Sequence, residues 1–192
     1  MKIIMQVNIT HLPKSKEQFQ FLLNKQSKVS FINEILDNSI NDFIHLGKLS
    51  QEKTNKFLVE REILFESMIL YLNSYFDIIS NILFIELKKR IVNSKLDKID
   101  YQNELITYSK ATEKIVEYWN CLEFKTIRNT SNALKHKKLL KVSYTIGSEG
   151  DGVCILPFTL QSFVLVKKLY HYDVYKYGIK MMQKIIEIIK LI

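Results

Sequence analysis

Apolar residues recur at helical spacing along most of this sequence, and the pattern predicts a series of long amphipathic helices. Residues 2–9 alternate weakly and could form an edge strand. Ser15 then precedes an acidic first turn, which indicates the start of a helix. A second helix is expected from about Ser30. It should end near Gly47, because glycine accepts the left-handed conformation at a helix end.

The longest expected helix begins at Ser50 and continues to about Ser94, because no glycine or proline interrupts this range. Within it, residues 68–87 are rich in Ile, Leu and Phe, but six of these positions are Asn, Ser, Asp or Glu. Polar groups are costly in the hydrocarbon of a bilayer. We therefore interpret the stretch as a buried central helix and expect no membrane span.

After a polar break at residues 97–100, a fourth helix is expected over about 101–124, and the segment 128–136 continues or follows it. Residues 141–146 and 153–156 have strand character. They flank a glycine-rich turn, so they predict a β-hairpin.

A last helix is expected from about Leu160 to the C-terminus, with a bend near Gly178. Together these elements predict an all-α fold class: a helical bundle with a long central helix and a small β-hairpin insertion before the C-terminal helix. We expect a single domain spanning residues 1–192, with the insertion at about 140–157.

The charge balance favours a polyanionic partner. Lys and Arg total 28 against 20 Asp and Glu, giving a net charge of +8. Cations that meet phosphates release condensed counterions, which drives binding to nucleic acids. A basic surface that serves solubility alone is the alternative. Cys121 and Cys154 are too few for a disulfide framework and lie among apolar residues, so we expect buried free thiols and a cytoplasmic location.

The segment 127–136 (IRNTSNALKH) concentrates the candidate chemistry. A guanidinium such as that of Arg128 matches phosphate oxygens and can stabilise charge on a reacting phosphorus. The imidazole of His136 can transfer a proton near neutral pH. RNA supplies its own nucleophile, the 2′-hydroxyl. One Arg and one His could therefore cleave RNA without metal.

Other polar residues extend this segment into an RNA-binding surface. Asn129 and Asn132 can donate to phosphate or ribose oxygens. The cations that add to the segment are Lys135, Lys137, Lys138 and Lys141, and Glu123 is the only acid across residues 123–141. The simplest alternative is that such a helix only presents a solvated face.

The segment resembles the motif of HEPN-domain proteins, in which an Arg followed by a polar residue precedes a His late in a helical bundle. Arg128-Asn129 matches the start of that motif and Lys135-His136 its end. The resemblance implies a homodimer in which Arg128 binds the scissile phosphate, His136 transfers protons and Asn129 orients the pair. It implies a metal-independent endoribonuclease of a toxin–antitoxin or phage-defence system, with an antitoxin or another defence protein as partner.

The spacing differs from that family, because seven residues separate Arg128 from His136 where the family has four to six. This difference favours an alternative, a non-catalytic interaction or dimerisation module with the same fold. Nucleic-acid binding without chemistry is a third hypothesis. No metal is expected, since His11, His45 and His171 lack partners at metal-ligand spacing. No glycine-rich phosphate loop is present, so we expect no cofactor.

The C-terminal region interleaves aromatic and basic residues. Its tyrosines and lysines are Tyr170, Tyr172, Tyr175 and Tyr177 with Lys167, Lys168, Lys176, Lys180 and Lys184. Such a pattern can stack and neutralise single-stranded RNA. Tyrosines that complete a core are the more common case, and we favour that interpretation here.

Overall fold

The computed structural model describes residues 16–44, 50–90, 110–135, 141–147, 150–160 and 163–189. Its helices are α1 (Lys16–Ile44), α2 (Gln51–Arg90), α3 (Lys110–Asn120), α4 (Leu122–Lys135) and α5 (His171–Ile189). Its strands are β1 (Val142–Thr145), β2 (Gly152–Ile155), β3 (Phe158–Leu160), β4 (Phe163–Leu165) and β5 (Leu169–Tyr170). The described residues are thus mostly helical, but the strands make the fold not purely all-α.

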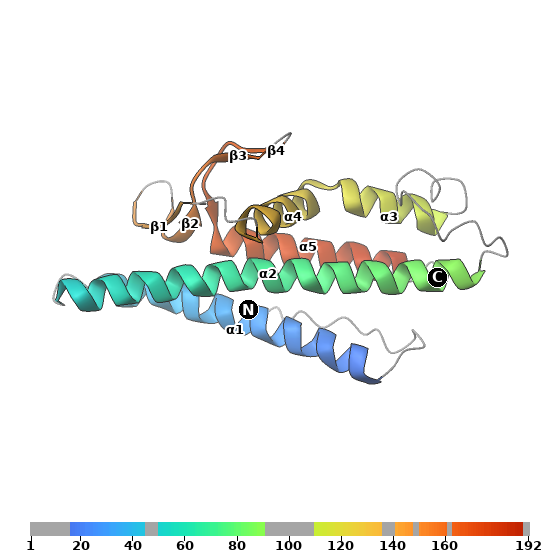
Figure 1. Cartoon of the computed structure of the whole chain (residues 1–192), viewed down its shortest axis with the longest axis horizontal. Coiled ribbons are helices and arrows are strands. Elements are labelled where there is room, and N and C mark those ends of the chain that lie inside the picture. Colours follow the sequence, from blue (N-terminus) through green and yellow to red (C-terminus); the bar gives the residue numbers. More distant parts are fainter. Residues whose placement is uncertain are drawn as a thin grey trace.

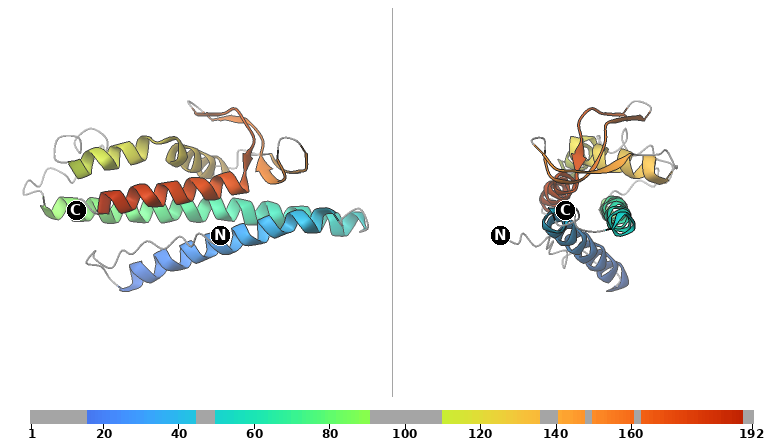
Figure 2. Two further views of the ribbon diagram at one scale, coloured as in Figure 1. Left: turned by 180° about the vertical axis from the view of Figure 1, so that it is seen from behind. Right: turned by 90° about the vertical axis from the view of Figure 1, so that its left-hand side faces the viewer.

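Helix α2 runs along the middle of the molecule (Figure 1). Helix α1 lies along one side of α2, whereas α5 and the α3–α4 pair lie along the other. The strands gather at one end of the bundle, beside the C-terminal end of α4 and the N-terminal end of α5, as the left view in Figure 2 also shows. This end therefore collects segments that are far apart in the sequence.

Helix α2 contributes a continuous apolar stripe to the core. Phe65, Met68, Ile69, Leu72 and Phe76 recur three and four residues apart and are almost completely buried. They pack within one cluster together with buried side chains of α1, α3, α4 and α5. The prediction of a buried central helix over residues 68–87 is confirmed for residues 68–80, the part whose burial the structure describes. Among the described residues, no helix is long and apolar enough to cross a membrane.

The predicted hairpin forms, and it belongs to a larger β region. Strands β1 and β2 pair antiparallel, with Val142 opposite Ile155, and β5 pairs antiparallel with the other edge of β2. Strands β3 and β4 form a separate two-stranded ribbon that projects from the bundle (Figure 1). The three-stranded sheet packs its buried β2 against the helices.

Two divisions between neighbouring helices were predicted wrongly. A single helix, α1, covers the range assigned to two helices that would meet near Ser30. The apolar stripe of Val29, Ile32 and Leu36 passes through that point without interruption, and no glycine or proline breaks it. Conversely, α3 and α4 are separated at Cys121, where the continuous helical pattern gave no break.

The last helix begins at His171 and not near Leu160. Residues 163–166 read Phe-Val-Leu-Val, and such β-branched and aromatic residues fit a pleated strand better than a helix. The β region consequently extends to Tyr170, beyond the predicted insertion at 140–157. Gly178 lies inside the unbroken helix α5, where a methyl group would come within 3.0 Å of Leu72.

Other predictions gain or lose support at particular positions. Ser50 caps α2, since its hydroxyl accepts from the backbone N–H of Lys53 at 3.5 Å. Cys121 and Cys154 are free thiols as predicted, but only Cys154 is buried and Cys121 is half-buried. The edge strand at residues 2–9, the stop at Gly47 and the polar break at 97–100 lie outside the described residues.

Candidate nucleic-acid interface

Helix α4 presents a basic face to solvent. Lys125, Arg128 and Lys135 are exposed and Asn132 is half-buried, and all four fall within about 80° of arc at 3.6 residues per turn. They extend over about 15 Å of helix. We call these four residues the α4 basic face. The helical repeat places these side chains on one side of α4, and their joint role in binding stays a prediction.

The single acid of α4 does not oppose this face. Glu123 lies on the opposite side of the helix and pairs with Lys180 of α5, with Nζ and Oε1 3.3 Å apart. Burial alone would raise the pKa of Glu123, but hydrogen bonds from its own backbone N–H and from Lys180 lower it. The carboxylate therefore stays ionised and is neutralised by a cation outside the α4 basic face.

The guanidinium of Arg128 lies over the ring of Phe124, 5.6 Å from the ring centroid. Phe124 is one turn closer to the N-terminus of α4, so the head group leans away from the helix end that leads to His136. This geometry anchors the cation without covering it, because a guanidinium over a ring keeps its in-plane donors available.

The remaining predicted site residues divide into two groups. Asn129 is half-buried about 100° around α4 from Arg128, at the border of the α4 basic face. Lys141 is exposed just before β1. His136, Lys137 and Lys138 lie outside the described residues, so the proposed pairing of Arg128 with His136 stays a prediction.

The opposite side of α4 is buried yet partly polar. Thr126, Thr130 and Ser131 have almost no exposed surface. Within the described part of the chain, the hydroxyls of Thr130 and Ser131 have no hydrogen-bond partner. Buried hydroxyls without partners cost stability. Residue type alone does not distinguish these buried residues from the neighbouring asparagines, because all of them are polar. Their positions in the helical repeat do distinguish them.

A second polar cluster surrounds a hollow of about 620 Å³ at the start of α5. Its lining comes from the base of the β3–β4 ribbon, the segment before β5 and the first turn of α5. The lining residues are Pro157, Val166, Lys167, Lys168, Tyr170, Tyr172 and Asp173. We call this hollow the ribbon pocket. Several of the C-terminal tyrosines and lysines noted in the sequence therefore meet here.

Tyr170 and Tyr172 stack with ring centroids 5.1 Å apart and ring planes 7° from parallel. Tyr170 is buried, and its hydroxyl accepts from Thr145 Oγ1 at 3.2 Å. Tyr172 is only half-buried and reaches over Gly150, the position at which a side-chain carbon would come 2.6 Å from its hydroxyl. The core interpretation thus holds for Tyr170, whereas Tyr172 forms part of an open wall.

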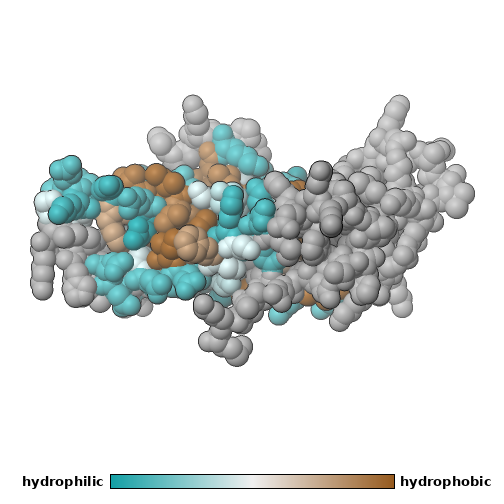
Figure 3. Space-filling model, turned by 90° about the horizontal axis from the view of Figure 1, so that it is seen from below, coloured by the Kyte–Doolittle hydropathy of each residue, from teal (hydrophilic) through white to brown (hydrophobic). Residues whose placement is uncertain are grey.

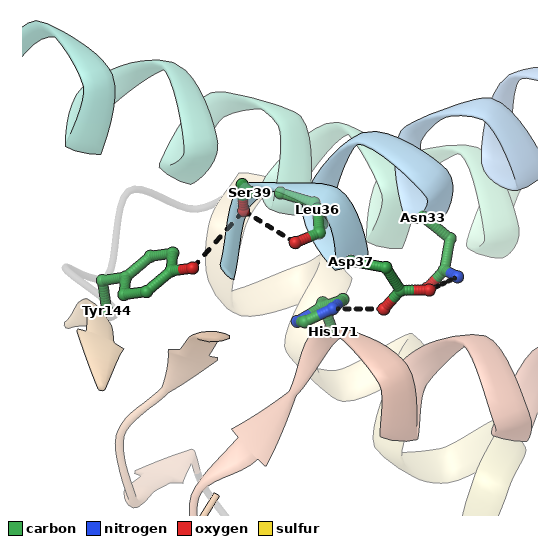
Figure 4. Close-up of polar contacts among 6 residues, drawn as sticks. All are labelled: Asn33, Leu36, Asp37, Ser39, Tyr144 and His171. Atoms are coloured by element: carbon green, nitrogen blue, oxygen red, sulfur yellow. Dashed lines mark hydrogen bonds and ion pairs between the residues drawn. The ribbon is translucent and has the colours of Figure 1, made fainter. Parts of the chain in front are cut away.

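His171, between these tyrosines, is fully buried and bonded to α1. Its Nε2 lies 2.9 Å from Oδ1 of Asp37, whose other oxygen accepts from Asn33 at 2.8 Å (Figure 4). A neighbouring contact joins Ser39 of α1 to Tyr144 of β1, with 3.5 Å between their hydroxyl oxygens. Because its ring has no exposed surface, His171 positions the start of α5 and cannot touch a bound molecule.

Sequence reasoning treated His171 as one of several scattered histidines. Its partner Asp37 is 134 positions away, and nothing in the local pattern connects the two. No group of three or more metal-ligating side chains comes together among the described residues.

No family model matches this chain, and neither does any curated protein or any solved structure. The HEPN resemblance accordingly rests on the residues quoted for it in the sequence. A proposal about function therefore depends on the geometry of the α4 basic face and of the ribbon pocket.

Proposed function

We propose that this protein binds RNA through the α4 basic face and cleaves it without metal, as a HEPN-like endoribonuclease of a toxin–antitoxin or phage-defence system. The observation that carries the proposal is the shared exposure of Lys125, Arg128 and Lys135 on one side of α4, with no carboxylate among them. Cations spaced over about 15 Å match successive phosphates of a strand better than a single small anion.

In this proposal Arg128 binds the scissile phosphate and His136 transfers the proton to or from the 2′-hydroxyl. Asn129 orients the pair from the border of the face. The lean of Arg128 toward Phe124 favours an arrangement in which the two functional groups come from different subunits of a homodimer. In such a dimer, the seven-residue gap within one chain does not limit how close the groups approach.

RNA binding is tested by its salt dependence. The logarithm of the affinity for single-stranded RNA should fall linearly with the logarithm of salt concentration, with a slope of about −0.7 per neutralised phosphate. Lys125→Gln/Lys135→Gln should make the slope about 1.4 less steep and weaken binding at low salt. The matched control is Lys53→Gln/Lys56→Gln, which removes the same charge from exposed positions at the start of α2. Equal effects of the two double substitutions would show that binding depends on the net charge of the protein and not on the α4 basic face.

Cleavage is tested with labelled RNA in EDTA. His136→Ala and Arg128→Ala should each lower the cleavage rate by at least about 100-fold, the usual scale for loss of a proton-transfer group or a charge stabiliser. His45→Ala serves as the control histidine and should leave the rate unchanged. Cleavage that requires added metal, or that survives both motif substitutions, would remove this mechanism.

The second candidate is a non-catalytic HEPN-like interaction or dimerisation module. Figure 3 shows apolar side chains gathered on the face of the molecule along which α1 lies, bordered by hydrophilic ones. Among the described residues of α1 and α2, Phe31, Val59 and Ile63 are large apolar side chains that are more than half exposed. Exposed apolar groups of this size are typical of association surfaces when they are contiguous.

The module hypothesis predicts association that depends on these side chains and not on His136. Sedimentation of Phe31→Ser/Ile63→Ser should show a lower mass than the wild type, whereas Leu122→Ser, an exposed apolar change on α4, should not. A stable assembly without ribonuclease activity would favour the module over the enzyme. Metal-independent cleavage lost in His136→Ala would favour the enzyme.

A further inference from the structure

The ribbon pocket has the size and shape of a small-ligand site. Its volume of about 620 Å³ lies within the range of cavities that hold nucleotide-sized molecules. One wall is apolar, formed by Pro157 and by Val166, which is 74% exposed. Covering an exposed valine with an apolar group removes its surface from water, which is favourable. This wall therefore favours contact with a flat apolar surface such as a base.

The charged lining favours a ligand that carries a negative charge and also has hydrogen-bond donors. Lys167 is exposed and Lys168 half-buried, and together they bring two cations to the hollow. Asp173, in the first turn of α5, adds one carboxylate, which accepts hydrogen bonds when ionised. Inorganic phosphate would add an anion beside the lysines but has no ribose hydroxyl or base amine for the carboxylate of Asp173. A nucleotide carries the phosphate and also ribose hydroxyls or base amines for the carboxylate.

The aromatic wall is held in place before any ligand arrives. Tyr172 stacks on Tyr170, whose hydroxyl is fixed by Thr145, and His171 between them is bonded to Asp37. Burial, followed by the nearby carboxylate of Asp173, raises the pKa of Tyr172. The phenol therefore remains a neutral donor near the lysines. A preorganised wall lowers the entropy cost of binding.

We propose that the ribbon pocket binds one nucleotide unit, with the phosphate at Lys167 and Lys168, the base against Pro157 and Val166, and a hydroxyl or amine donating to Asp173. The unit is an unpaired nucleotide of the RNA strand that crosses the α4 basic face, so its source rests on the proposed function. The Glu123–Lys180 pair and the antiparallel run of α4 and α5 bring Lys135 and the pocket to the same end of the bundle (Figure 1).

The test titrates the full chain with 5′-AMP, adenosine and inorganic phosphate in separate calorimetric experiments. AMP should bind more tightly than either part alone. Lys167→Gln/Lys168→Gln should weaken AMP binding by about tenfold or more, the factor that 1.4 kcal/mol represents. Val166→Ser should weaken AMP binding and leave phosphate unchanged. Lys53→Gln/Lys56→Gln is the charge-matched control and should bind AMP like the wild type.

Absence of AMP binding, equal binding of phosphate and AMP, or AMP binding that survives the Lys167/Lys168 change would each overturn the inference. Binding of a ten-nucleotide single-stranded RNA then distinguishes this inference from the proposed function. RNA binding that depends on Lys125 and Lys135 but not on Lys167 and Lys168 would sink the pocket as an RNA site and keep the α4 basic face. AMP binding at the pocket without any RNA binding would keep the pocket as a free-nucleotide site and remove the proposed function.

Discussion

His171 is held from three directions although it has no exposed surface. Asp37 bonds its Nε2, Tyr172 meets it edge-on with ring centroids 5.3 Å apart, and the backbone of Gly152 lies against its Cε1. Its Nδ1 has no hydrogen-bond partner among the described residues. The ring is therefore fixed by one hydrogen bond and by packing against Tyr172 and Gly152.

Gly152 should tolerate no side chain. Its φ is +119°, and a methyl group would lie 2.6 Å from Cε1 of His171. Gly152→Ala should therefore lower the free energy of unfolding by about 3 kcal/mol, as backbone strain adds to the displacement of a buried ring. Gly147→Ala is the matched control, since φ is +151° there with no atom within 4 Å. Gly147→Ala should lower the free energy of unfolding by only about 1 kcal/mol. Urea denaturation measures both, and equal losses would contradict the close packing at His171.

Removing the hydroxyl of Thr130 and removing that of Thr145 should change the free energy of unfolding in opposite directions. Thr130→Val removes a buried hydroxyl that has no partner in the described structure, so it should raise the free energy of unfolding by about 1 kcal/mol. Thr145→Val removes the donor to Tyr170 and should lower it by a similar amount. Both substitutions keep the side-chain shape. Thermal unfolding that moves in the same direction for the two variants would argue against this account.

At the scale of elements, α2 carries two acids one turn apart at its middle. Glu62 and Glu66 lie four positions apart, the spacing at which helical side chains meet. Burial, and after it the charge of Glu62, raises the pKa of Glu66. The folded state therefore binds the proton of Glu66 more tightly than the unfolded chain does, so ionisation of Glu66 is mildly destabilising.

Glu66→Gln should stabilise the fold at neutral pH by a few tenths of a kcal/mol, the scale of a like-charge pair at this spacing. The benefit should vanish as the pH falls through the range in which carboxyls titrate, because the wild-type group is then neutral as well. Glu117→Gln is the contrasting variant. A hydrogen bond from Lys114 lowers the pKa of Glu117, so its ionised form is favoured in the fold and the substitution should be slightly unfavourable at neutral pH. Unfolding midpoints measured across pH distinguish the two profiles.

The long elements were predictable, and the strands only partly. The α2 stripe from Phe65 to Phe76 repeats at helical spacing over several turns, so its burial followed from periodicity. Residues 160–170 were assigned to the last helix, because an apolar run such as 163–166 fits either state. Their pairing, with Phe158 opposite Leu165, is what selects the ribbon, and pairing partners are not visible in local pattern.

At the scale of the whole molecule, the two candidate surfaces were not equally predictable. The α4 basic face lies within one helix, so the 3.6-residue repeat places Lys125, Arg128 and Lys135 together. The ribbon pocket is different, because Pro157 reaches Tyr172 only after β2, β5 and the ribbon have paired. Asp37 and His171 meet only when α1 packs against the start of α5.

The contact between Asp37 and His171 should connect global stability to the ribbon pocket. Asp37→Ala leaves a buried donor unpaired and should lower the free energy of unfolding by about 2 kcal/mol. It should also weaken AMP binding, because the tyrosine wall loses its support. Asp37→Asn keeps an acceptor and should recover most of both losses. If Asp37→Ala matched the wild type in urea denaturation and in AMP titration, His171 would not be positioning this end of the bundle.

The separation of Asp37 from His171 also has a consequence during synthesis. A ribosome adds about 5 to 20 residues per second, so roughly 7 to 27 seconds pass between the appearance of the acid and that of its histidine over the 134 intervening positions. Once α2 has also been synthesised, the apolar stripe of α1 can pair with it, but it cannot close against α5 until residues 171–189 follow. The nascent chain should therefore wait as a helical hairpin with one open apolar side, which is the kind of intermediate that chaperones shield.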